Sequence, residues 1–572
     1  MKKRVVAGAL ILAMLGLTAC SGTGDPSEPS KTEDVSEIRK PEEANETEKA
    51  GEEADDSIKT EAGDTSAGDA LTDDGTVLTS GPILEKYTWF DSVDNSDDLP
   101  EGDYDNYKNY GDIHIDSYGV FGDGYEALDK ALFEEYEERK QGIQWFEDSI
   151  SEAMAYEDEA GFPWPYEDDT TVYRSDEKVV SYLSNRYLYL GGAHGGTSVK
   201  GCNFDTDSGK RLAISDVVRD PDGMCDAVKE KLAPRADELF EEWEDTVYRD
   251  IHEGEAENGA FAWVLNKDSI EFVFGDYEIA PFAAGHIHVE IKDEEYPGLL
   301  NAEYLDEASL LVRHLTPFEN TELDLDGDGE DELIRVEPQG QYNDEYGYNE
   351  YMKVKAVVVK DGKEIYSEEL EDNDFSDAYI MENEDGLYFM YVEMQSDNDW
   401  HIVYAFDLND PGKSIKNMGQ CSAGAFYDFD PVDPETLVMG TRVNTMGTRS
   451  AYRICYVDEG GMIVPYDDEY YIRLYDDSRI YPEEDYDDYK YLHTAIDFTA
   501  YEDIDRTKAV IIPAKTRLCP LRTDDETYMV FSDESGKEYY VFYDEERPED
   551  EWERFIDGHR ETEIFEDVMY AG

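Results

Sequence analysis

Positive charge is scarce in this 572-residue chain, which carries 49 Lys and Arg residues against 140 Asp and Glu residues. The formal net charge of −91 describes a surface that repels nucleic acid and anionic wall polymers and attracts cationic proteins and Ca²⁺. We therefore expect no nucleic-acid partner. Two interpretations of the acidity stay open: it keeps an exported protein soluble, or it recognises a cationic partner.

The signatures of common catalytic sites are also missing. The sequence contains no GxSxG elbow, no HExxH helix, no Cys–His protease signature and no Gly-rich phosphate loop. Paired carboxylates of the kind that hydrolyse glycosidic bonds stay open, because acidic residues occur throughout the chain. We predict no catalytic residue and expect a protein that is not an enzyme.

Cysteine is rare, with six residues in the chain, and none lies in a CxxC or Cys/His zinc pattern. A metal site built from thiolates is therefore not expected. Besides Cys20 there are five cysteines, and their odd number leaves at least one thiol unpaired. Cys202–Cys225 and Cys421–Cys455 are conceivable disulfides, but the sequence does not decide either pair.

Only one long apolar run is present, and it lies at the N-terminus. Residues 2–4 are basic, residues 5–17 are apolar, and Leu17-Thr-Ala-Cys20 follows. This order is typical of a secretion signal, and the cysteine after Leu-Thr-Ala resembles a bacterial lipobox. The resemblance implies cleavage before Cys20 and lipidation, including palmitate, of its thiol. We expect residues 1–20 to be a lipoprotein signal peptide and the lipid to be the only membrane attachment, at the outer face of the cytoplasmic membrane.

Residues 21–80 contain no Phe, Tyr or Trp, although aromatic residues make up 13% of the chain. Such a segment buries too little apolar area to offset its chain entropy. We predict a disordered, acidic tether that holds the folded part away from the membrane.

The remaining chain is too long for one core, so several domains are expected. Residues 83–315 read as an α+β domain. Its predicted elements are helices over 125–140 and 225–247, the second kinked or split at Pro234, and strands over 178–190, 197–204, 269–274 and 286–291. Residues 316–485 read as an all-β domain, a sandwich or a propeller-like array. Residues 507–572 read as a small SH3-like β-barrel.

A run of acidic residues at the start of the second domain predicts a metal loop. The sequence from Asp324 reads DLDGDGEDEL, and carboxylates at alternate positions before a Gly turn can converge on Ca²⁺. Arg335 stands where an EF-hand has its closing Glu, and the stretch instead resembles the loops of FG-GAP repeats. By that resemblance the side chains of four residues and one carbonyl would bind structural Ca²⁺: Asp324, Asp326, Asp328 and Glu332, with the carbonyl of Glu330.

The histidines offer a second candidate. His194 lies in the motif GGAHGG (191–196), between two predicted strands, which favours a hairpin connection. His286 and His288 form an HxH pair, whose side chains share one face of a strand and can chelate a metal with His194 or a carboxylate as third ligand. The alternative is that the pair lines a half-exposed strand. We interpret His194 as a ligand contact or a structural residue rather than a catalyst.

Three motifs of the first domain carry a family resemblance. They lie at 180–197, which ends in GGAHGGT, at 203–216, and at 272–285, which reads FVFGDYEIAPFAAG. In order and spacing they resemble a bacterial extracytoplasmic domain family. Its members include the outer domain of the lysozyme-sensing anti-sigma factor and the non-catalytic domain of some peptidoglycan deacetylases. The resemblance covers less than half of the chain and implies an α+β binding domain, some members of which bind lysozyme.

These observations favour a cell-surface lipoprotein with a non-catalytic ligand-binding role at the envelope. The expected partner is a cationic protein such as lysozyme, or a peptidoglycan fragment. A cell-wall-active hydrolase or deacetylase accessory protein is one alternative, and a structural or assembly module is another. No transmembrane helix, sigma-binding segment or deacetylase metal motif is seen, so the chain is not expected to be an anti-sigma factor or a deacetylase.

Overall fold

The structure is a computed structural model, and every described residue belongs to the second of two compact units, Thr65–Gly572. The described residues are 81–95, 108–121, 124–154, 163–191, 194–254, 262–305, 310–343, 348–371, 374–396, 400–409, 416–426, 429–473, 490–545, 553–566 and 568–570. The predicted signal peptide, Cys20 and the acidic tether lie outside them. Within these ranges no helix is both long enough and apolar enough to cross a membrane.

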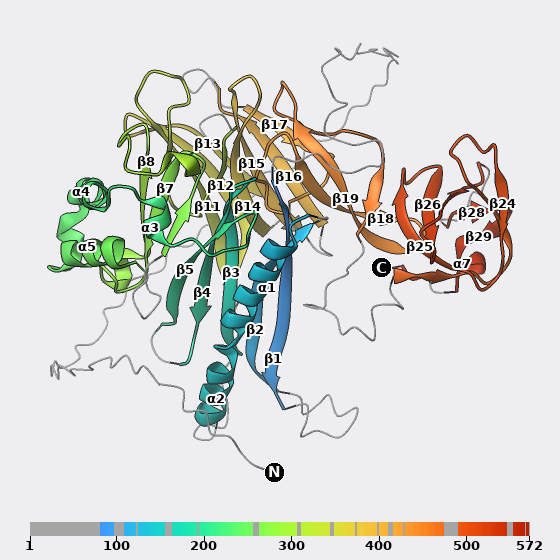
Figure 1. The fold of residues 1–572 in the computed structure, drawn as a ribbon, viewed down its shortest axis with the longest axis horizontal. Helices are drawn as coiled ribbons and strands as arrows, with labels where there is room; N and C mark the ends of the chain where they lie inside the picture. The colour runs from blue at the N-terminus through green and yellow to red at the C-terminus, as the bar shows by residue number, and fades with distance from the viewer. Residues whose placement is uncertain are drawn as a thin grey trace, which may run out of the picture. The chain divides into compact units, whose positions relative to one another are not determined.

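The described chain is multi-domain and mostly β, with several sheets and a few helices (Figure 1). The first sheet has the order β1-β2-β3-β4-β5. Its strands are β1 (Ile83–Asp94), β2 (Asn109–Phe121), β3 (Trp164–Ser175), β4 (Val179–Leu188) and β5 (Gly196–Asp205). The pair β2–β3 is parallel and the other pairs are antiparallel. The predicted α+β character of this region is confirmed.

Two helices connect β2 to β3, as a parallel pair requires a crossover. They are α1 (Glu126–Lys140), which confirms the helix predicted over 125–140, and α2 (Ile143–Met154). Apolar side chains of both helices pack on alternate residues of β2, among them Ile113 and Ile115. The intervening His114 and Asp116 face the other side of the sheet, since side chains alternate along a strand.

The GGAHGG segment connects β4 to β5, and the pairing of Leu188 with Gly196 confirms the predicted hairpin. Gly191 at the start of the connection has φ +82°, a conformation that glycine adopts without steric cost. Gly191 and His194 therefore lie in the connection between two paired strands of one sheet.

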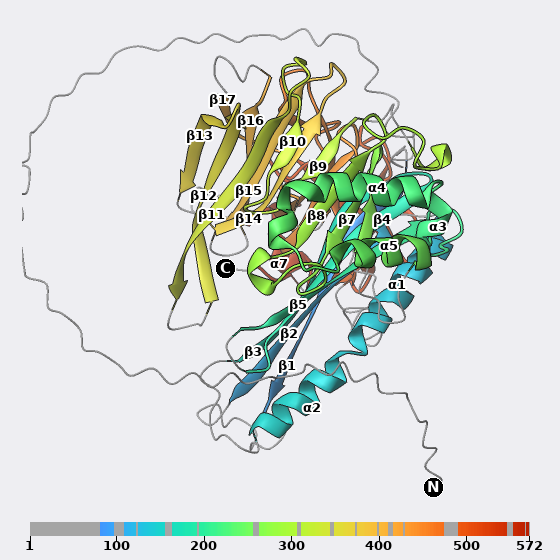
Figure 2. The ribbon, with the colours of Figure 1, turned by 90° about the vertical axis from the view of Figure 1, so that its left-hand side faces the viewer.

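A helical layer covers the second sheet, β6-β7-β8 (Figure 2). Its strands are β6 (Ala262–Leu265), β7 (Ser269–Phe274) and β8 (Ile287–Lys292). Its helices are α3 (Ile214–Val217), α4 (Pro221–Leu232), α5 (Trp243–Glu253) and the 3-10 turns Ala233–Glu238, Phe282–Ala284 and Ala302–Tyr304. Pro234 lies in the turn between α4 and α5, so the predicted split of this helix is confirmed.

The next two sheets share one apolar core. One has the order β10-β11-β12-β13 and the other β17-β16-β15-β14-β9. Their bounds are β9 (Val312–His314), β10 (Thr321–Leu323), β11 (Glu332–Asn343), β12 (Tyr348–Lys360), β13 (Lys363–Glu371), β14 (Asp374–Glu382), β15 (Tyr388–Ser396), β16 (Trp400–Asp407) and β17 (Lys416–Gln420). The predicted β-rich character of this region is confirmed.

A ten-stranded sheet contains the C-terminal strands. Its members are β18 (Leu437–Asn444), β19 (Thr448–Val457), β20 (Ile463–Pro465), β21 (Tyr470–Ile472), β22 (Leu492–His493), β23 (Phe498–Tyr501), β24 (Ala509–Ile512), β25 (Arg517–Thr523), β26 (Tyr528–Asp533) and β27 (Glu538–Phe542). A hairpin and a short helix follow: β28 (Phe555–Ile556), β29 (His559–Arg560) and α7 (Glu561–Ile564). Strand pairing runs from β18 to β24 without closing among the described residues, so the SH3-like barrel stays a prediction.

The five cysteines after Cys20 are all buried and free. The conceivable pair Cys202–Cys225 is wrong because the two thiols lie in separate apolar cores, Cys202 on β5 beneath α1 and Cys225 on the buried face of α4. Cys421 and Cys455 share one core but are not bonded to each other.

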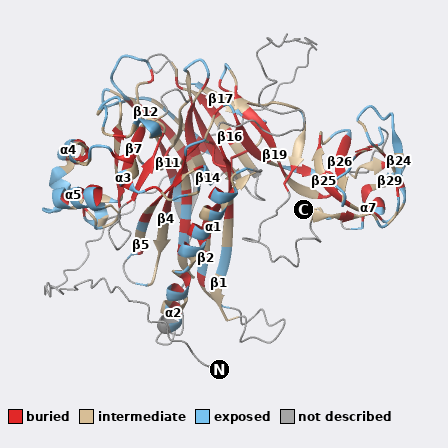
Figure 3. Ribbon diagram, in the orientation of Figure 1, coloured by how far each residue is buried: buried red, intermediate tan, exposed pale blue. Residues whose placement is uncertain are grey.

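Buried residues recur along α1 between exposed ones (Figure 3), and two of them, Glu135 and Arg139, are charged. The Arg139 guanidinium lies 2.9 Å from Glu135 and 2.9 Å from Asp168, and it donates to the carbonyl of Asp116 at 2.6 Å. Burial works against the charge of Glu135, but Arg139 and Lys200 outweigh it and lower the pKa of Glu135 to about 2. This network joins α1 to both β2 and β3.

We expect Arg139→Met to lower the free energy of unfolding by about 3–5 kcal/mol, because two buried carboxylates lose the buried cation they share and keep only the partly exposed Lys200 and Arg186. The matched control is Lys130→Met on the same helix, which breaks an exposed pair with Glu134 and costs less than about 1 kcal/mol. Urea unfolding followed by tryptophan fluorescence compares the two. Equal losses would show that the buried network does not stabilise the fold.

The depressed pKa of Glu135 also predicts a pH dependence. A carboxyl with a lowered folded-state pKa contributes stability above its unfolded pKa of about 4.3, and this contribution is lost as the pH falls toward 2. The stability difference between Glu135→Gln and the parent chain should therefore shrink between about pH 4.5 and pH 2 in the same urea experiment. A constant difference across this range would contradict the assignment.

Candidate functional site

A cleft of about 920 Å³ lies between the first sheet and the sheet that contains β14 and β15. Five of the nine histidines of the chain line it: His114, His286, His288, His314 and His401. Six carboxylates also line it: Asp116, Asp169, Glu319, Asp377, Glu393 and Asp430. Only Lys86 and Arg473 among its lining residues carry a fixed positive charge. Most of the titratable side chains around this cleft are therefore acidic or imidazole groups.

Four of these histidines pair with carboxylates, and three of the four do so outside the cluster of His114. His314 lies 2.6 Å from Asp377, and His401 lies 2.7 Å from Glu393. His288 lies 2.6 Å from Glu271 through Nδ1 and 3.5 Å from Glu319 through Nε2. Burial disfavours the protonated form of His314, but the charge of Asp377 prevails and raises the pKa of this imidazole.

The two basic side chains of the cleft are already held by acids. Lys86 Nζ lies 3.0 Å from Asp430, which also accepts a hydrogen bond from the Tyr118 hydroxyl. Burial works against the Lys86 ammonium, yet Asp430 and the other acidic groups around it together outweigh burial and raise the pKa of Lys86 well above its usual range. Arg473 is bonded to Glu85. The positive charge of the cleft is thus neutralised by the protein itself.

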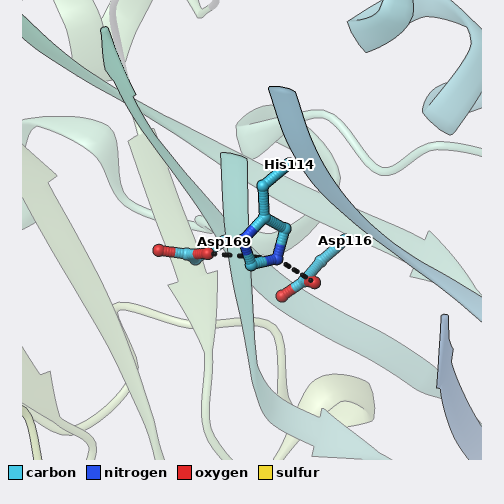
Figure 4. Close-up of side chains that lie close together, drawn as sticks. All are labelled: His114, Asp116 and Asp169. Atoms are coloured by element: carbon cyan, nitrogen blue, oxygen red, sulfur yellow. Dashed lines mark hydrogen bonds and ion pairs between the residues drawn. The ribbon is translucent and has the colours of Figure 1, made fainter. Parts of the chain in front are cut away.

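The fourth histidine belongs to a tight cluster on the first sheet (Figure 4). His114 Nε2 lies 3.1 Å from Asp116 Oδ1 and 3.8 Å from Asp169 Oδ1. Burial disfavours protonation of His114, but the hydrogen bond that Asp116 accepts and the charges of Asp116, Asp169 and Glu167 together outweigh burial and raise the pKa of His114. Burial and the nearby Asp116 charge together raise the pKa of Asp169 to about 6, although its carboxylate is 59% exposed to the solvent of the cleft.

The fifth histidine, His286, contacts a threonine. Its Nε2 lies 2.8 Å from Thr197 Oγ1, and the same hydroxyl donates to Asp276. In a catalytic triad the acid orients the imidazole so that the imidazole can take the hydroxyl proton. Here the acid bonds to the hydroxyl instead, which holds Thr197 without orienting His286 as its base.

The HxH pair predicted from the sequence reaches the cleft, but its two imidazoles have different partners. Among the described residues, the groups of three or more possible ligands within 4.8 Å of one another include neither His286 nor His288. His194 is exposed, stacks on Phe282 at 4.3 Å between ring centroids and does not line the cleft. The structure therefore does not bring these three histidines together.

The carboxylates of the predicted acidic loop, residues 324–332, do lie close together. Ligand atoms of Asp324, Asp326 and Glu332 lie within 4.8 Å of one another, and the backbone turns through Gly327 and Gly329 with positive φ. The ammonium of Lys360, on β12, lies 2.7 Å from Asp326, 2.8 Å from Asp328 and 2.5 Å from Glu332. Glu330 contributes its backbone N–H to Asp328. The loop thus gathers its carboxylates around one cation that belongs to the chain.

Sequence reasoning missed His114, Asp116, Asp169, His314 and His401. The available signal was the alternation HID at 114–116, which places two ligand-type side chains on one strand face. Asp169 is brought beside them only by the parallel pairing of β2 with β3, which joins residues far apart in the sequence.

Comparison with known proteins gives one family and one curated relative. Residues 215–294, which include α4, α5 and β6 to β8, match the family DUF3298, described as a protein of unknown function. The chain is 28% identical over 144 residues to the peptidoglycan-N-acetylmuramic acid deacetylase PdaC of Bacillus subtilis. This match covers 24% of the chain and 30% of the relative, so the two share less than a third of their lengths.

Two solved structures are similar to part of the chain. A DUF3298 family member from Bacteroides fragilis is 19% identical with a TM-score of 0.29, and covers 39% of this chain and 96% of its own. A DUF3298 family protein from Pseudomonas aeruginosa PAO1 is 16% identical with a TM-score of 0.28, and covers 40% of this chain and 98% of its own. The chain thus contains a DUF3298 segment at residues 215–294 and is distantly related to a deacetylase of the cell wall.

Proposed function

We propose that this chain is a lipid-anchored protein of the bacterial cell envelope that binds a cationic ligand without catalysing a reaction on it. Its lipid would be carried by Cys20 at the outer face of the cytoplasmic membrane. The observation that carries the proposal is the cleft, where six carboxylates meet five imidazoles but only two side chains of fixed positive charge, both already paired. The relation to a peptidoglycan-acting enzyme supports a place at the cell wall.

The shape and charge of the cleft suit side chains of a cationic protein. A volume of about 920 Å³ lies in the range of sites that enclose small ligands, and it admits several Lys or Arg side chains. Asp169 and Glu319 present accessible carboxylates, with side chains 59% and 37% exposed. The net charge of −91 would draw such a partner toward the surface before it reaches the cleft. Lysozyme, a cationic wall hydrolase, is the representative we select.

A binding experiment with lysozyme tests the proposal. The full chain should bind lysozyme at physiological salt, and Asp169→Asn with Glu319→Gln should weaken binding by about tenfold or more, roughly 1.4 kcal/mol. The matched control is Glu303→Gln with Glu526→Gln, which removes the same charge at exposed positions outside the cleft. Calcium-saturated EDTA in the buffer removes transition metals from the comparison.

Two results would contradict this function. Absence of binding at physiological salt would remove the cationic protein as a ligand. Equal weakening in both double variants, with binding lost at modest salt, would show that overall charge acts alone, because exposed charges separated by more than a Debye length are screened. Binding of muropeptides in place of lysozyme, measured in parallel, would assign the cleft to a wall fragment.

We also propose that the acidic loop binds structural Ca²⁺ through Asp324, Asp326, Asp328 and Glu332, with the carbonyl of Glu330. Ca²⁺ takes six to eight oxygen ligands at about 2.3–2.6 Å, which a cluster of carboxylates supplies. The Lys360 ammonium already makes contact with three of these side chains, so the loop accommodates a cation at its centre. When bound, the ion would join the loop before β11 to the end of β12.

Lys360 provides the test, because its ammonium competes for the same oxygens. Lys360→Met should tighten Ca²⁺ binding by about tenfold, while Lys355→Met, which removes a cation from the same strand but from an ion pair with Glu364, should not. Isothermal titration of the full chain in excess Mg²⁺ measures both. Absence of heat with millimolar Ca²⁺, or equal affinity in the two variants, would contradict the site.

A further inference from the structure

His114, Asp116 and Asp169 have the spacing of ligands around one metal ion. Two atoms bound tetrahedrally to Zn²⁺ at about 2.0–2.2 Å lie roughly 3.4 Å apart. The observed separations from His114 Nε2 are 3.1 Å to Asp116 Oδ1 and 3.8 Å to Asp169 Oδ1, and ligand atoms of all three residues lie within 4.8 Å of one another (Figure 4). Small side-chain rotations are enough to place all three around a common centre.

Strand geometry fixes this arrangement. His114 and Asp116 are two residues apart on β2 and share the cleft face, while Ile115 between them is fully buried on the helix side. The parallel register pairs Ile115 with Asp168, so Asp169 follows on the neighbouring strand. Asp168 points to Arg139 beneath the sheet, and Asp169 therefore points to the cleft.

The innermost ligand is oriented by further hydrogen bonds. Asp116 Oδ1 accepts from Thr88 Oγ1 at 2.7 Å, and Oδ2 accepts from the backbone N–H of Thr170 at 3.2 Å. Partners of this kind orient metal ligands and fix their rotamers. The Asp116 side chain is 8% exposed, whereas that of His114 is 34% and that of Asp169 is 59% exposed. The cluster thus has a fixed base and an accessible side toward the cleft.

The geometry points to a divalent transition-metal site, with Zn²⁺ as the best-fitting ion, held by His114, Asp116 and Asp169. Imidazole and carboxylate together suit zinc, whereas Ca²⁺ and Mg²⁺ prefer oxygen ligands alone. Three protein ligands leave the fourth tetrahedral position open, as in sites where the metal takes water or an exogenous ligand. That position faces the cleft, so a ligand bound in the cleft could coordinate the ion. This inference does not rest on the proposed cationic ligand.

A titration of the full chain with Co²⁺, followed by visible absorption, tests the site directly. Excess Ca²⁺ is present throughout, so that the many exposed carboxylates and the acidic loop do not take up the metal. The parent chain should bind one equivalent and develop the intense absorption of four- or five-coordinate Co²⁺, which one equivalent of Zn²⁺ then displaces. His114→Ala and Asp169→Asn should each weaken binding by more than about tenfold.

Two control variants separate this site from other imidazoles. His194→Ala removes an exposed histidine outside the cleft, and His286→Ala removes one that lines the cleft but stands apart from the cluster. Both should keep the affinity and spectrum of the parent chain, and unchanged urea midpoints for every variant show that each folds. Absence of a one-to-one spectrum, full binding by His114→Ala, or loss in His286→Ala alone would each overturn the proposal.

Discussion

The buried guanidinium of Arg139 connects the parts of the protein on which the candidate site depends. It bonds to Asp168 on β3 and to the carbonyl of Asp116 on β2, and it reaches both from α1. These contacts lie directly beneath the cluster of His114, Asp116 and Asp169 on the opposite face of the same two strands. A parallel pair of strands joined by a helical crossover is thereby held in one register, and this register decides which carboxylates meet in the cleft.

Electrostatics explains why the cleft differs from the rest of this acidic chain. A surface of net charge −91 is mostly solvated carboxylate, which binds cations weakly and without selectivity. In the cleft, by contrast, carboxylates are partly desolvated and paired with imidazoles, as in His314–Asp377 and His401–Glu393. Partial burial strengthens each interaction and fixes its geometry. The same physical setting serves both proposals, a cationic side chain and a metal ion, and Asp169 takes part in both.

In the acidic loop, too, carboxylates are placed around a cation. Lys360 places an ammonium among Asp326, Asp328 and Glu332, and a fully buried Glu332 requires a cation of some kind. An internal lysine meets this requirement when no metal is present. Ca²⁺ would replace one cation by another, which makes the loop a point of competition rather than an unfilled site.

Local patterns predicted the elements whose cause is local. Helix α1, the hairpin around GGAHGG, the split at Pro234 and strand β7 follow from helical periodicity, glycine conformation, the missing proline N–H and alternating apolar residues. The predictions that were wrong concern features that are set by packing across the fold rather than by a local pattern. Cys202 and Cys225 are close in sequence but lie in different cores.

The candidate site shows the same limit. His286 and His288 are two residues apart, yet their imidazoles have different hydrogen-bond partners. His286 contacts Thr197, and His288 contacts Glu271. His114 and Asp169 come together only through the pairing of β2 with β3, which no short window of sequence reveals. The loop of alternating carboxylates could be predicted from the sequence because all its members lie in one turn. The contact of Lys360, which comes from β12, could not be predicted.

We propose that the cleft face of β2 and β3 is a built ligand site rather than a set of surface ion pairs. Anomalous diffraction at the zinc absorption edge, from crystals of the chain grown with Zn²⁺ and excess Ca²⁺, tests it most directly. We expect an anomalous peak within bonding distance of His114 Nε2 and of the carboxylates of Asp116 and Asp169. A map with no peak there, while zinc occupies other carboxylates, would contradict it.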